Sequence, residues 1–256
     1  MTTARFFGLL AIVAVGLATV GPRAAAARCS TPGYCIDQCQ SIDFPGSYTL
    51  GDDLTGSPNQ VCLTITSSNV TLDLSGWTIS GQVSGDCISD GGNSLTGIVV
   101  KNGRVTNCNV GINLNNTSNC KIEGVQALKN DADGIKVKEG CIVTNSVASH
   151  NGRGDTCTGN GIAAFVNGHG IVGRDDNLIE ETVATENGGD GIHVAFGNNI
   201  KTVVTRDNCN DGVRLTGDGN NVKEDRGGGN NGADIVANNC SSQTLNDNSS
   251  PCTTGN

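Results

Sequence analysis

Aliphatic residues recur along most of the chain as short pairs in which one polar residue separates two apolar ones. Ile192-His193-Val194 is one such segment, and Val213-Arg214-Leu215 follows it 21 residues later. This alternation is typical of a β-strand with one buried and one exposed face. An Asp-Gly dipeptide, such as Asp190-Gly191, precedes the strand and indicates a turn. The repeating unit therefore begins N-x-x-D-G-I-x-V and continues with two further short strands.

An asparagine five residues before most of these strands sets the frame of the repeat. It recurs at Asn107, Asn130, Asn151, Asn187, Asn208 and Asn230. Four of the five spacings are 21 to 23 residues, and the fifth, between Asn151 and Asn187, is 36. Eight residues before most of these asparagines lies a second apolar column, namely Ile122, Val143, Ile179, Ile200 and Val222. We predict that the asparagines form an internal ladder that hydrogen-bonds backbone groups at a bend.

The period of the repeat predicts a solenoid. Three short strands and three turns cannot bury an apolar face alone, but stacked copies of the unit can. We therefore predict an all-β fold, a single-stranded right-handed parallel β-helix of about seven to eight rungs over residues 67–240. The 37 glycines and the 3% aromatic content fit this fold, because small stacked side chains fill its narrow core.

The N-terminus has the features of a secretory signal peptide. Arg5 precedes an apolar run from Phe6 to Val20, and the small residues Ala24 to Ala27 follow. The run is shorter than the roughly 20 apolar residues of a membrane-spanning helix, so we expect no membrane span. The chain then divides into a signal peptide, a Cys-rich N-terminal cap, the β-helix and a polar C-terminal tail, at residues 1–27, 28–66, 67–240 and 241–256.

Charge limits the choice of partners. Removing residues 1–27 deletes two of the 16 Lys and Arg residues and none of the 25 acids, which leaves 14 against 25 and a formal net charge of −11. Nucleic acid and anionic membranes both reward a basic face, so we expect neither as a partner. We expect the protein to be a monomer.

The twelve cysteines all follow the signal peptide. An even number in a secreted chain predicts disulfide bonds in an oxidising compartment, either extracellular or periplasmic. Cys120 and Cys141 each stand ten residues before an asparagine of the ladder. They would face each other on adjacent rungs about 4.8 Å apart, within the usual Cα separation of a disulfide. We predict this bond, and a second one between Cys240 and Cys252 that closes the C-terminal end.

Segments of the first rungs resemble a known group of proteins. Phe44 to Tyr48, Val61 to Ile65 and Asn69 to Gly81 look like the start of bacterial secreted proteins with right-handed parallel β-helix repeats. These belong to the pectate-lyase-like superfamily, which includes the NosD-like periplasmic proteins, and the resemblance covers residues 42–240. It implies the fold. It leaves the activity open, because the superfamily holds lyases, hydrolases, epimerases and members without known chemistry.

The 36-residue spacing indicates an insertion of fifteen residues in one repeat. We predict that about six lie between Asn151 and Ile162 and about nine between Ala164 and Leu178, as two loops that flank one strand. These loops would carry Asp155, His169, Arg174, Asp175 and Asp176. A role in function and an insertion without function are equally consistent with the sequence of these loops.

The outward residue of the N-x-x-D-G-I-x-V strand defines a candidate site. From rung to rung this residue is Asn113, Lys136, Ala163, His193, Arg214 and Val236, and the adjoining turns carry Asp133, Asn160, Asp190 and Asp211. A groove of cations flanked by carboxylates suits an acidic polysaccharide, because cations neutralise a uronate carboxylate and a base can then remove the neighbouring proton. Catalytic candidates are Asp133, His169, His193 and Arg214, and binding candidates are Lys136, Asp190, Asp211 and Arg174.

Metal binding is a further possibility for this column. Asp133, Asp190 and Asp211 would suit Ca²⁺, which prefers carboxylate oxygens. Copper, with which NosD-like proteins are associated, fits poorly, because the chain has one Met, in the signal peptide, and three His. The alternative is that Asp-Gly is turn chemistry and the cations are solvated.

A partial resemblance to polygalacturonases concerns three segments. Asp131 to Ile135, Asn167 to Gly173 and Gly212 to Thr216 are similar to their N-T-D-G, G-H-G and R-I-K segments, in the same order. Their paired aspartates would fall near Gly159 to Ile162, where both acids are missing. Since an inverting glycosidase needs two carboxylates, the resemblance implies hydrolase activity only weakly.

Two classes of function therefore stay open. The favoured one is a secreted, non-catalytic or weakly catalytic module associated with an acidic polysaccharide, with lyase, epimerase or glycoside hydrolase activity as the enzymatic alternative. The other is a purely structural extracellular spacer. The loops predicted around Ile162 would separate the two classes, since a cleft formed with Lys136, His193 and Arg214 favours the first.

Overall fold

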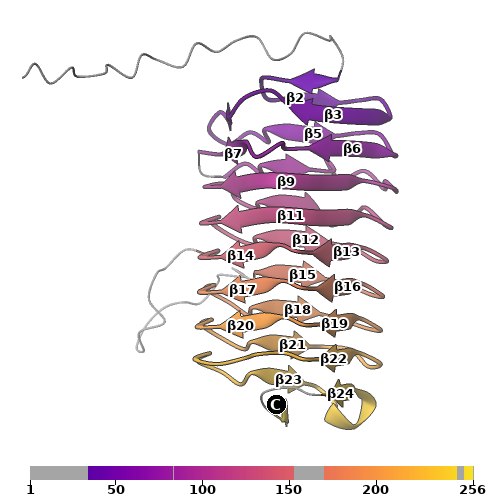
Figure 1. The fold of residues 1–256 in the computed structure, drawn as a ribbon, viewed down its shortest axis with the longest axis vertical. Helices are drawn as coiled ribbons and strands as arrows, with labels where there is room; N and C mark the ends of the chain where they lie inside the picture. The colour runs from indigo at the N-terminus through magenta and orange to yellow at the C-terminus, as the bar shows by residue number, and fades with distance from the viewer. Residues whose placement is uncertain (1–33, 83, 153–169, 247–250, 256) are drawn as a thin grey trace, which may run out of the picture.

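The protein is an all-β solenoid of about nine turns. The computed structural model describes residues 34–82, 84–152, 170–246 and 251–255. Parallel strands stack along one long axis, with the N-terminal rungs at one end and the C-terminal rungs at the other (Figure 1). The predicted parallel β-helix class is confirmed, and the structure has slightly more turns than the seven to eight expected.

One side of the solenoid is a ten-stranded parallel sheet. The strands are β2 Gln40–Ile42, β5 Leu63–Ile65, β8 Ile88–Ser89, β10 Ile112–Leu114, β12 Ile135–Val137, β15 Ile171–Gly173, β18 Ile192–Val194, β21 Val213–Leu215, β23 Ile235–Ala237 and β25 Cys252–Thr254. Six of these strands, namely β5, β10, β12, β15, β18 and β21, have the inward–outward–inward pattern expected from the I-x-V motif.

The other two sides form a fifteen-stranded sheet. Its strands are β1 Cys35–Ile36, β3 Gly46–Leu50, β4 Leu54–Thr55, β6 Val70–Asp73, β7 Thr78–Ser80, β9 Val99–Thr106, β11 Lys121–Leu128, β13 Ile142–Thr144, β14 Val147–Ser149, β16 Leu178–Glu180, β17 Val183–Thr185, β19 Asn199–Lys201, β20 Val204–Arg206, β22 Asn221–Lys223 and β24 Thr244–Asn246. A short 3₁₀ helix, η1 Cys240–Ser242, precedes β24.

A single left-handed residue makes the corner between these two sides in seven successive rungs. We call this set the corner column, and its members with positive φ are Gly76, Asn102, Gly124, Asn145, Glu181, Thr202 and Glu224. The left-handed region is open to Gly and tolerated by Asn, but it strains most other residues. The corner column therefore reverses the outward direction within one residue and lets β9 and β11 pair across the bend.

The core is a narrow stack of aliphatic side chains. Ile200 is fully buried and is paired with Ile179 on one side and Val222 on the other. Its neighbour Lys201 faces outward, with Nζ 3.5 Å from a carboxylate oxygen of Glu180. The predicted inward column is confirmed, because the alternating pattern assigns faces residue by residue.

The predicted asparagine ladder is present, with one correction. The side-chain oxygen of Asn151 accepts the Nδ2 and backbone N–H of Asn130, and the same pair of bonds joins Asn151 to Asn187. Asn208 and Asn230 continue the ladder. Asn107 is not a member. It is exposed with φ of 55°, and Cys108 takes the first place, donating its backbone N–H to Asn130.

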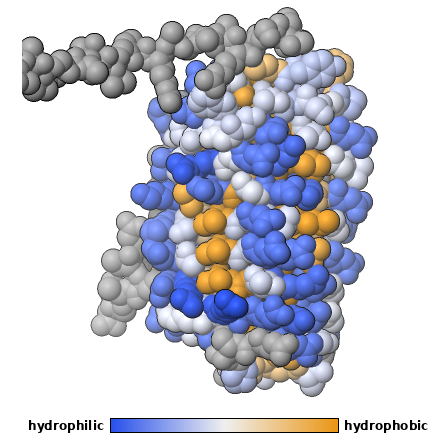
Figure 2. Space-filling model, viewed as in Figure 1, coloured by the Kyte–Doolittle hydropathy of each residue, from blue (hydrophilic) through white to orange (hydrophobic). Residues whose placement is uncertain are grey.

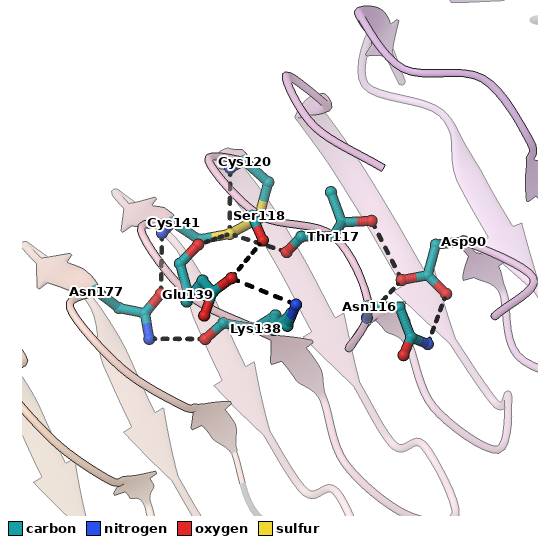
Figure 3. A network of polar contacts seen from close by, with 9 residues as sticks. All are labelled: Asp90, Asn116, Thr117, Ser118, Cys120, Lys138, Glu139, Cys141 and Asn177. Atoms are coloured by element: carbon teal, nitrogen blue, oxygen red, sulfur yellow. Dashed lines mark hydrogen bonds and ion pairs between the residues drawn. A yellow bond between two sulfur atoms is a disulfide. The ribbon is translucent and has the colours of Figure 1, made fainter. Parts of the chain in front are cut away.

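A second asparagine ladder, which the sequence analysis missed, runs along another bend. Asn177, Asn198 and Asn220 pass the same two hydrogen bonds from rung to rung. The ladder begins at the backbone N–H of Cys141, beside the Cys120–Cys141 disulfide, and Asn177 also donates to the carbonyl of Lys138 (Figure 3). Buried backbone groups at both bends are thus satisfied by side chains.

Disulfides link neighbouring rungs. Both predicted bonds, Cys120–Cys141 and Cys240–Cys252, are present, with Cα–Cα distances of 4.4 and 6.0 Å. Cys39–Cys62 and Cys87–Cys108 also connect adjacent rungs, and Cys35 and Cys209 are disulfide-bonded as well. Four described pairs fit the predicted oxidising compartment.

The insertion does not divide in two as expected. The strand that pairs with both β12 and β18 is β15, in which Ile171 lies beside Ile135 and Ile192. All fifteen extra residues therefore precede β15, and Arg174, Asp175 and Asp176 belong to an ordinary turn after it. Asp155, Asn160, Ile162, Ala163 and His169 lie outside the described residues. In the part of the chain that the structure describes, no helix is long and apolar enough to cross a membrane.

Candidate functional site

The outward column of the ten-stranded sheet brings two basic residues together. His193 on β18 pairs in register with Arg214 on β21. Lys136 on β12 is two rungs from His193, and Val172 on β15 stands between them. Val172 takes the place predicted for Ala163, so one apolar residue interrupts the basic column.

Each basic residue of the column is held by an aspartate three positions earlier. The distances are 3.4 Å from Lys136 Nζ to Asp133, 3.0 Å from His193 Nδ1 to Asp190, and 2.8 Å from Arg214 Nη1 to Asp211. The aspartate side chains are only 5%, 2% and 9% exposed. We call these three pairs the stripe. The Asp-Gly turn places the carboxylate below the surface. The inward aliphatic residue follows the glycine, and the basic residue after it points outward again, next to the carboxylate.

In Asp190 and Asp211, the second carboxylate oxygen accepts a hydrogen bond from the backbone of the next rung. Asp190 Oδ1 accepts the N–H of Asp211 at 3.1 Å, and Asp211 Oδ1 accepts the N–H of Ala233 at 3.0 Å. Both oxygens are therefore engaged, one by a basic side chain and one by an amide. Among the described residues, no group of three or more His, Cys, Asp or Glu side chains is arranged to hold a metal ion. The geometry of the stripe does not fit the Ca²⁺ considered above, because Ca²⁺ needs several carboxylate oxygens directed at one point.

An open pocket of about 500 Å³ lies at the C-terminal half of the stripe. Asp190, His193, Asp211 and Arg214 line it, together with Cys209, Asn210, Asn231 and Gly232. Gly232 is needed there, because a Cβ at this position would collide with Oδ1 of Asp211. The pocket thus follows from two successive Asp-Gly turns and the outward residues behind them.

The His193–Asp190 contact gives the pocket a defined acid–base geometry. With Nδ1 3.0 Å from the buried carboxylate of Asp190, the imidazole of His193 is held in one orientation at the pocket. Arg214 on the adjacent rung supplies a guanidinium that can take a carboxylate in a two-point contact.

The remaining predicted site residues lie elsewhere. Asp133 and Lys136 share the face but do not line the pocket, because the rung of Val172 intervenes. Arg174 is exposed in the turn after β15, where its N–H bonds the carbonyl of Lys138. Near it, a hydrogen bond from Ser118 and the contact with Lys138 hold the pKa of Glu139 below its usual value, with a smaller contribution from Arg174. His169 is outside the described residues.

One aspartate of the same kind was missed. Asp86, before β8, accepts the side-chain N–H of Asn113 at 2.8 Å and the backbone N–H of Val110 at 3.0 Å. Cys87 stands where later rungs have Gly, which hid the Asp-Gly pattern in the sequence. An aspartate two residues before the inward aliphatic residue, with or without a glycine between them, would have identified all of these positions.

No family model and no curated protein matches the chain. Pectate lyase Pel9A is similar in structure, with 13% identity and a TM-score of 0.42, covering 83% of this chain and 70% of that one. The catalytic domain of a GH87 α-1,3-glucanase has 10% identity and a TM-score of 0.42, and covers 79% of this chain and 51% of that one, so this chain spans about half its length. The A-module of Azotobacter vinelandii mannuronan C-5 epimerase AlgE4 has 12% identity and a TM-score of 0.38, with 86% of each chain covered.

The class of protein is defined by strand pairing and not by these distant likenesses. It is a disulfide-linked parallel β-solenoid with an outward stripe of basic residues anchored on buried aspartates. The resemblance to NosD-like proteins remains a prediction.

Proposed function

We propose that this protein binds an acidic polysaccharide along the stripe, with the pocket at His193 and Arg214 as the main contact. The observation that carries the proposal is that two basic side chains on adjacent rungs, each anchored by a buried aspartate, border one open pocket of about 500 Å³. Pockets of this size hold small organic molecules, and one or a few sugar units fall in this class.

The guanidinium of Arg214 suits the carboxylate of a uronate sugar. Asp211 engages Nη1, and the planar group offers five N–H donors in a fixed fork that matches a carboxylate. Because the side chain is already ordered by its aspartate, less conformational entropy is lost when a ligand binds. The formal charge of −11 opposes a polyanion at long range, so we expect modest affinity that depends on local contacts and weakens with salt.

Uronate elimination or epimerisation is a second candidate, and the His193–Asp190 contact favours it. With the carboxylate on Arg214, Nε2 of His193 would remove the proton from C5 of the sugar. In elimination, the electron pair left at C5 forms the C4–C5 double bond, the bond between C4 and the glycosidic oxygen breaks, and the departing oxygen takes a proton from water. In epimerisation, water delivers a proton to C5 from the opposite face. Binding without turnover is the preferred function, because both carboxylates of the pocket are already paired and no separate acid stands opposite His193 among its described lining residues.

Arg214→Gln tests the proposal. We expect binding of oligogalacturonate or oligomannuronate to weaken about 10-fold or more, the effect of losing a charge-assisted hydrogen bond. The melting temperature should change little, because this side chain is 35% exposed. Isothermal titration calorimetry measures the affinity, and circular dichroism measures the melting temperature.

Lys201→Gln is the matched control, since it removes one positive charge from the other sheet, where Lys201 is paired with Glu180. Unchanged affinity in Arg214→Gln, or an equal loss in Lys201→Gln, contradicts a stripe-specific contact. The ultraviolet absorbance of unsaturated uronate and the proton exchange at C5 report elimination and epimerisation in the same samples. Absence of binding to every uronate polymer tried would favour the structural-spacer function.

A further inference from the structure

A second pocket lies on the fifteen-stranded sheet, away from the stripe. It has a volume of about 380 Å³ and is formed where β7, β9 and β11 pass the corner column. Its lining includes Gly76, Thr78, Asn102, Arg104, Gly124 and Gln126. None of these residues belongs to the site described above, and the two pockets share no strand.

The pocket is open because glycine occupies the corner column at this level. Gly76 and Gly124 stand on either side of Asn102, and a Cβ on Gly76 would meet nothing within 4 Å. In the later rungs the corner column carries larger side chains, namely Asn145, Glu181, Thr202 and Glu224. The second pocket is therefore confined to these rungs, and the corner column does not form such a pocket in the later rungs that the structure describes.

The outward-facing residues next to the corner column change from polar to apolar after β11. Over β7, β9 and β11 they are the polar residues Thr78, Arg104 and Gln126. Over β14, β17 and β20 they are the half-buried Val147, Val183 and Val204. Figure 2 shows the apolar side chains stacked over these later strands. Polar side chains therefore occupy these positions beside the open corner, and apolar side chains replace them over β14, β17 and β20.

Arg104 is the charged side chain of this pocket, and its partner is neutral. Its Nε and Nη2 both donate to Oε1 of Gln126, at 3.2 and 2.9 Å. Over the described ranges, no carboxylate forms an ion pair with Arg104, whereas Arg214 has Asp211. Gln126 orders the guanidinium without cancelling its charge, which leaves an oriented cation at the pocket wall.

The surroundings favour a ligand with one negative group and several hydroxyls. The side-chain amide of Asn102 and the hydroxyl of Thr78 can hydrogen-bond sugar hydroxyls. Two carboxylates lie close by. Asp53 accepts the backbone N–H of Thr78, and Asp73 is paired with Lys101 and accepts from Asn102. A second negative group on the ligand would be repelled by these aspartates, whereas hydroxyls can donate to them.

We propose that this corner pocket binds a single carboxylate-bearing sugar unit, with Arg104 on the carboxylate and Asn102 and Thr78 on the hydroxyls. Its volume lies near the lower end of the range for small-molecule sites, about 300–1,000 Å³, which suits one sugar. The site lies on a different sheet from the stripe, so either can bind without the other.

Trp77 provides a local readout. It is the single tryptophan of the chain, it lies between Gly76 and Thr78, and it is partly buried. The experiment titrates the whole secreted protein with galacturonic acid and short oligogalacturonates and follows tryptophan emission. We expect a saturable change with these ligands, none with galactose, and at least a 10-fold loss of affinity in Arg104→Gln. Arg206→Gln, an exposed arginine of the same sheet, should bind as the parent does.

Gly124→Asn is a second variant, which places a side chain in the second pocket without straining the backbone. Asn145 has the equivalent corner position in the next rung, with φ of 49°, so asparagine is accepted there. We expect this variant to keep its melting temperature and lose the fluorescence response. Arg214→Gln should keep the response, which separates this pocket from the stripe.

Three outcomes overturn the proposal of a binding site, and a fourth overturns its assignment to a carboxylate. One is an equal response to galactose, and another is parental affinity in Arg104→Gln. The third is the absence of both a fluorescence change and calorimetric heat when the Arg214→Gln protein is titrated. A sulfated monosaccharide that binds more tightly than galacturonate would also overturn the assignment to carboxylate.

Discussion

At the scale of single residues, Asp225 is a carboxyl group placed in the core. It follows β22, is 1% exposed, and continues the inward position of Val203 in the rung before. Thr205 donates its hydroxyl to Oδ1 at 3.0 Å. Burial raises the pKa of Asp225 to about 7, the negative charge of Asp234 adds to this rise, and the hydrogen bond from Thr205 opposes it.

The raised pKa predicts that stability falls as pH rises. The folded protein holds this proton more tightly than the unfolded chain, whose value is near 3.8, so the stabilisation is complete below about pH 4 and is lost by about pH 7. The loss is at most about 4 kcal/mol. Asp225→Asn keeps the acceptor for Thr205, and we expect it to raise the melting temperature at pH 8 by roughly 5–10 °C and to flatten the dependence on pH.

Asp234→Asn is the companion variant. Removal of its charge should lower the pKa of Asp225, so that the loss of stability becomes smaller and is complete at a lower pH. Thermal melting by circular dichroism between pH 4 and 8 measures both effects. A melting curve of Asp225→Asn with the same pH dependence as the parent would show that another group titrates.

At the scale of the strand, the alternation of faces makes β19 a sharp test of register. Ile200→Asp would bury an unpaired charge between Ile179 and Val222, and we expect a loss of about 3–5 kcal/mol or failure to fold. Lys201→Asp introduces the same side chain one residue later, where Lys201 is 39% exposed, and should cost below about 1 kcal/mol. Chemical denaturation measures both, and equal losses would mean that the faces are exchanged.

The sequence pattern predicted the faces of individual strands correctly. It failed to predict which of two similar segments forms the strand of the rung with the insertion. The second apolar column placed Ile200 inward and the I-x-V motif placed Arg214 outward, because period-two alternation is a property of the strand alone. The same motif fits the segments beginning at Ile162 and Ile171, and pairing with β12 and β18 selected the second. The second asparagine ladder was missed because Asn177 and Asn198 follow no Asp-Gly dipeptide, and Asp218-Gly219 before Asn220 lies outside the N-x-x-D-G-I-x-V frame.

At the scale of the whole molecule, each rung contacts its neighbours, so stability is nearly one-dimensional. The Cys240–Cys252 disulfide closes the C-terminal end and should stabilise the last rungs only. We expect the double variant Cys240→Ser with Cys252→Ser to raise amide hydrogen exchange in β23 to β25 and to leave β9 to β12 unchanged. Hydrogen exchange read by mass spectrometry tests this. A uniform increase along the chain would indicate a globally cooperative fold.

The sequence by itself determined the rung period, the buried face of each strand, and the two disulfides predicted from it. These follow from spacing along the chain, because stacking at about 4.8 Å converts equal spacing into contact. The stripe was also largely foreseeable, since His193 and Arg214 share a position in the repeat.

Only the tertiary structure decided what those side chains contact. It directed Asp190 and Asp211 each to the basic residue of its own rung and to a backbone amide of the next rung, which engaged the oxygens that Ca²⁺ would need. It placed the whole insertion before β15. It also brought Gly76, Arg104 and Gln126 together at one corner. These contacts depend on which rungs stack on each other and where the chain bends, and the sequence of a single repeat specifies neither.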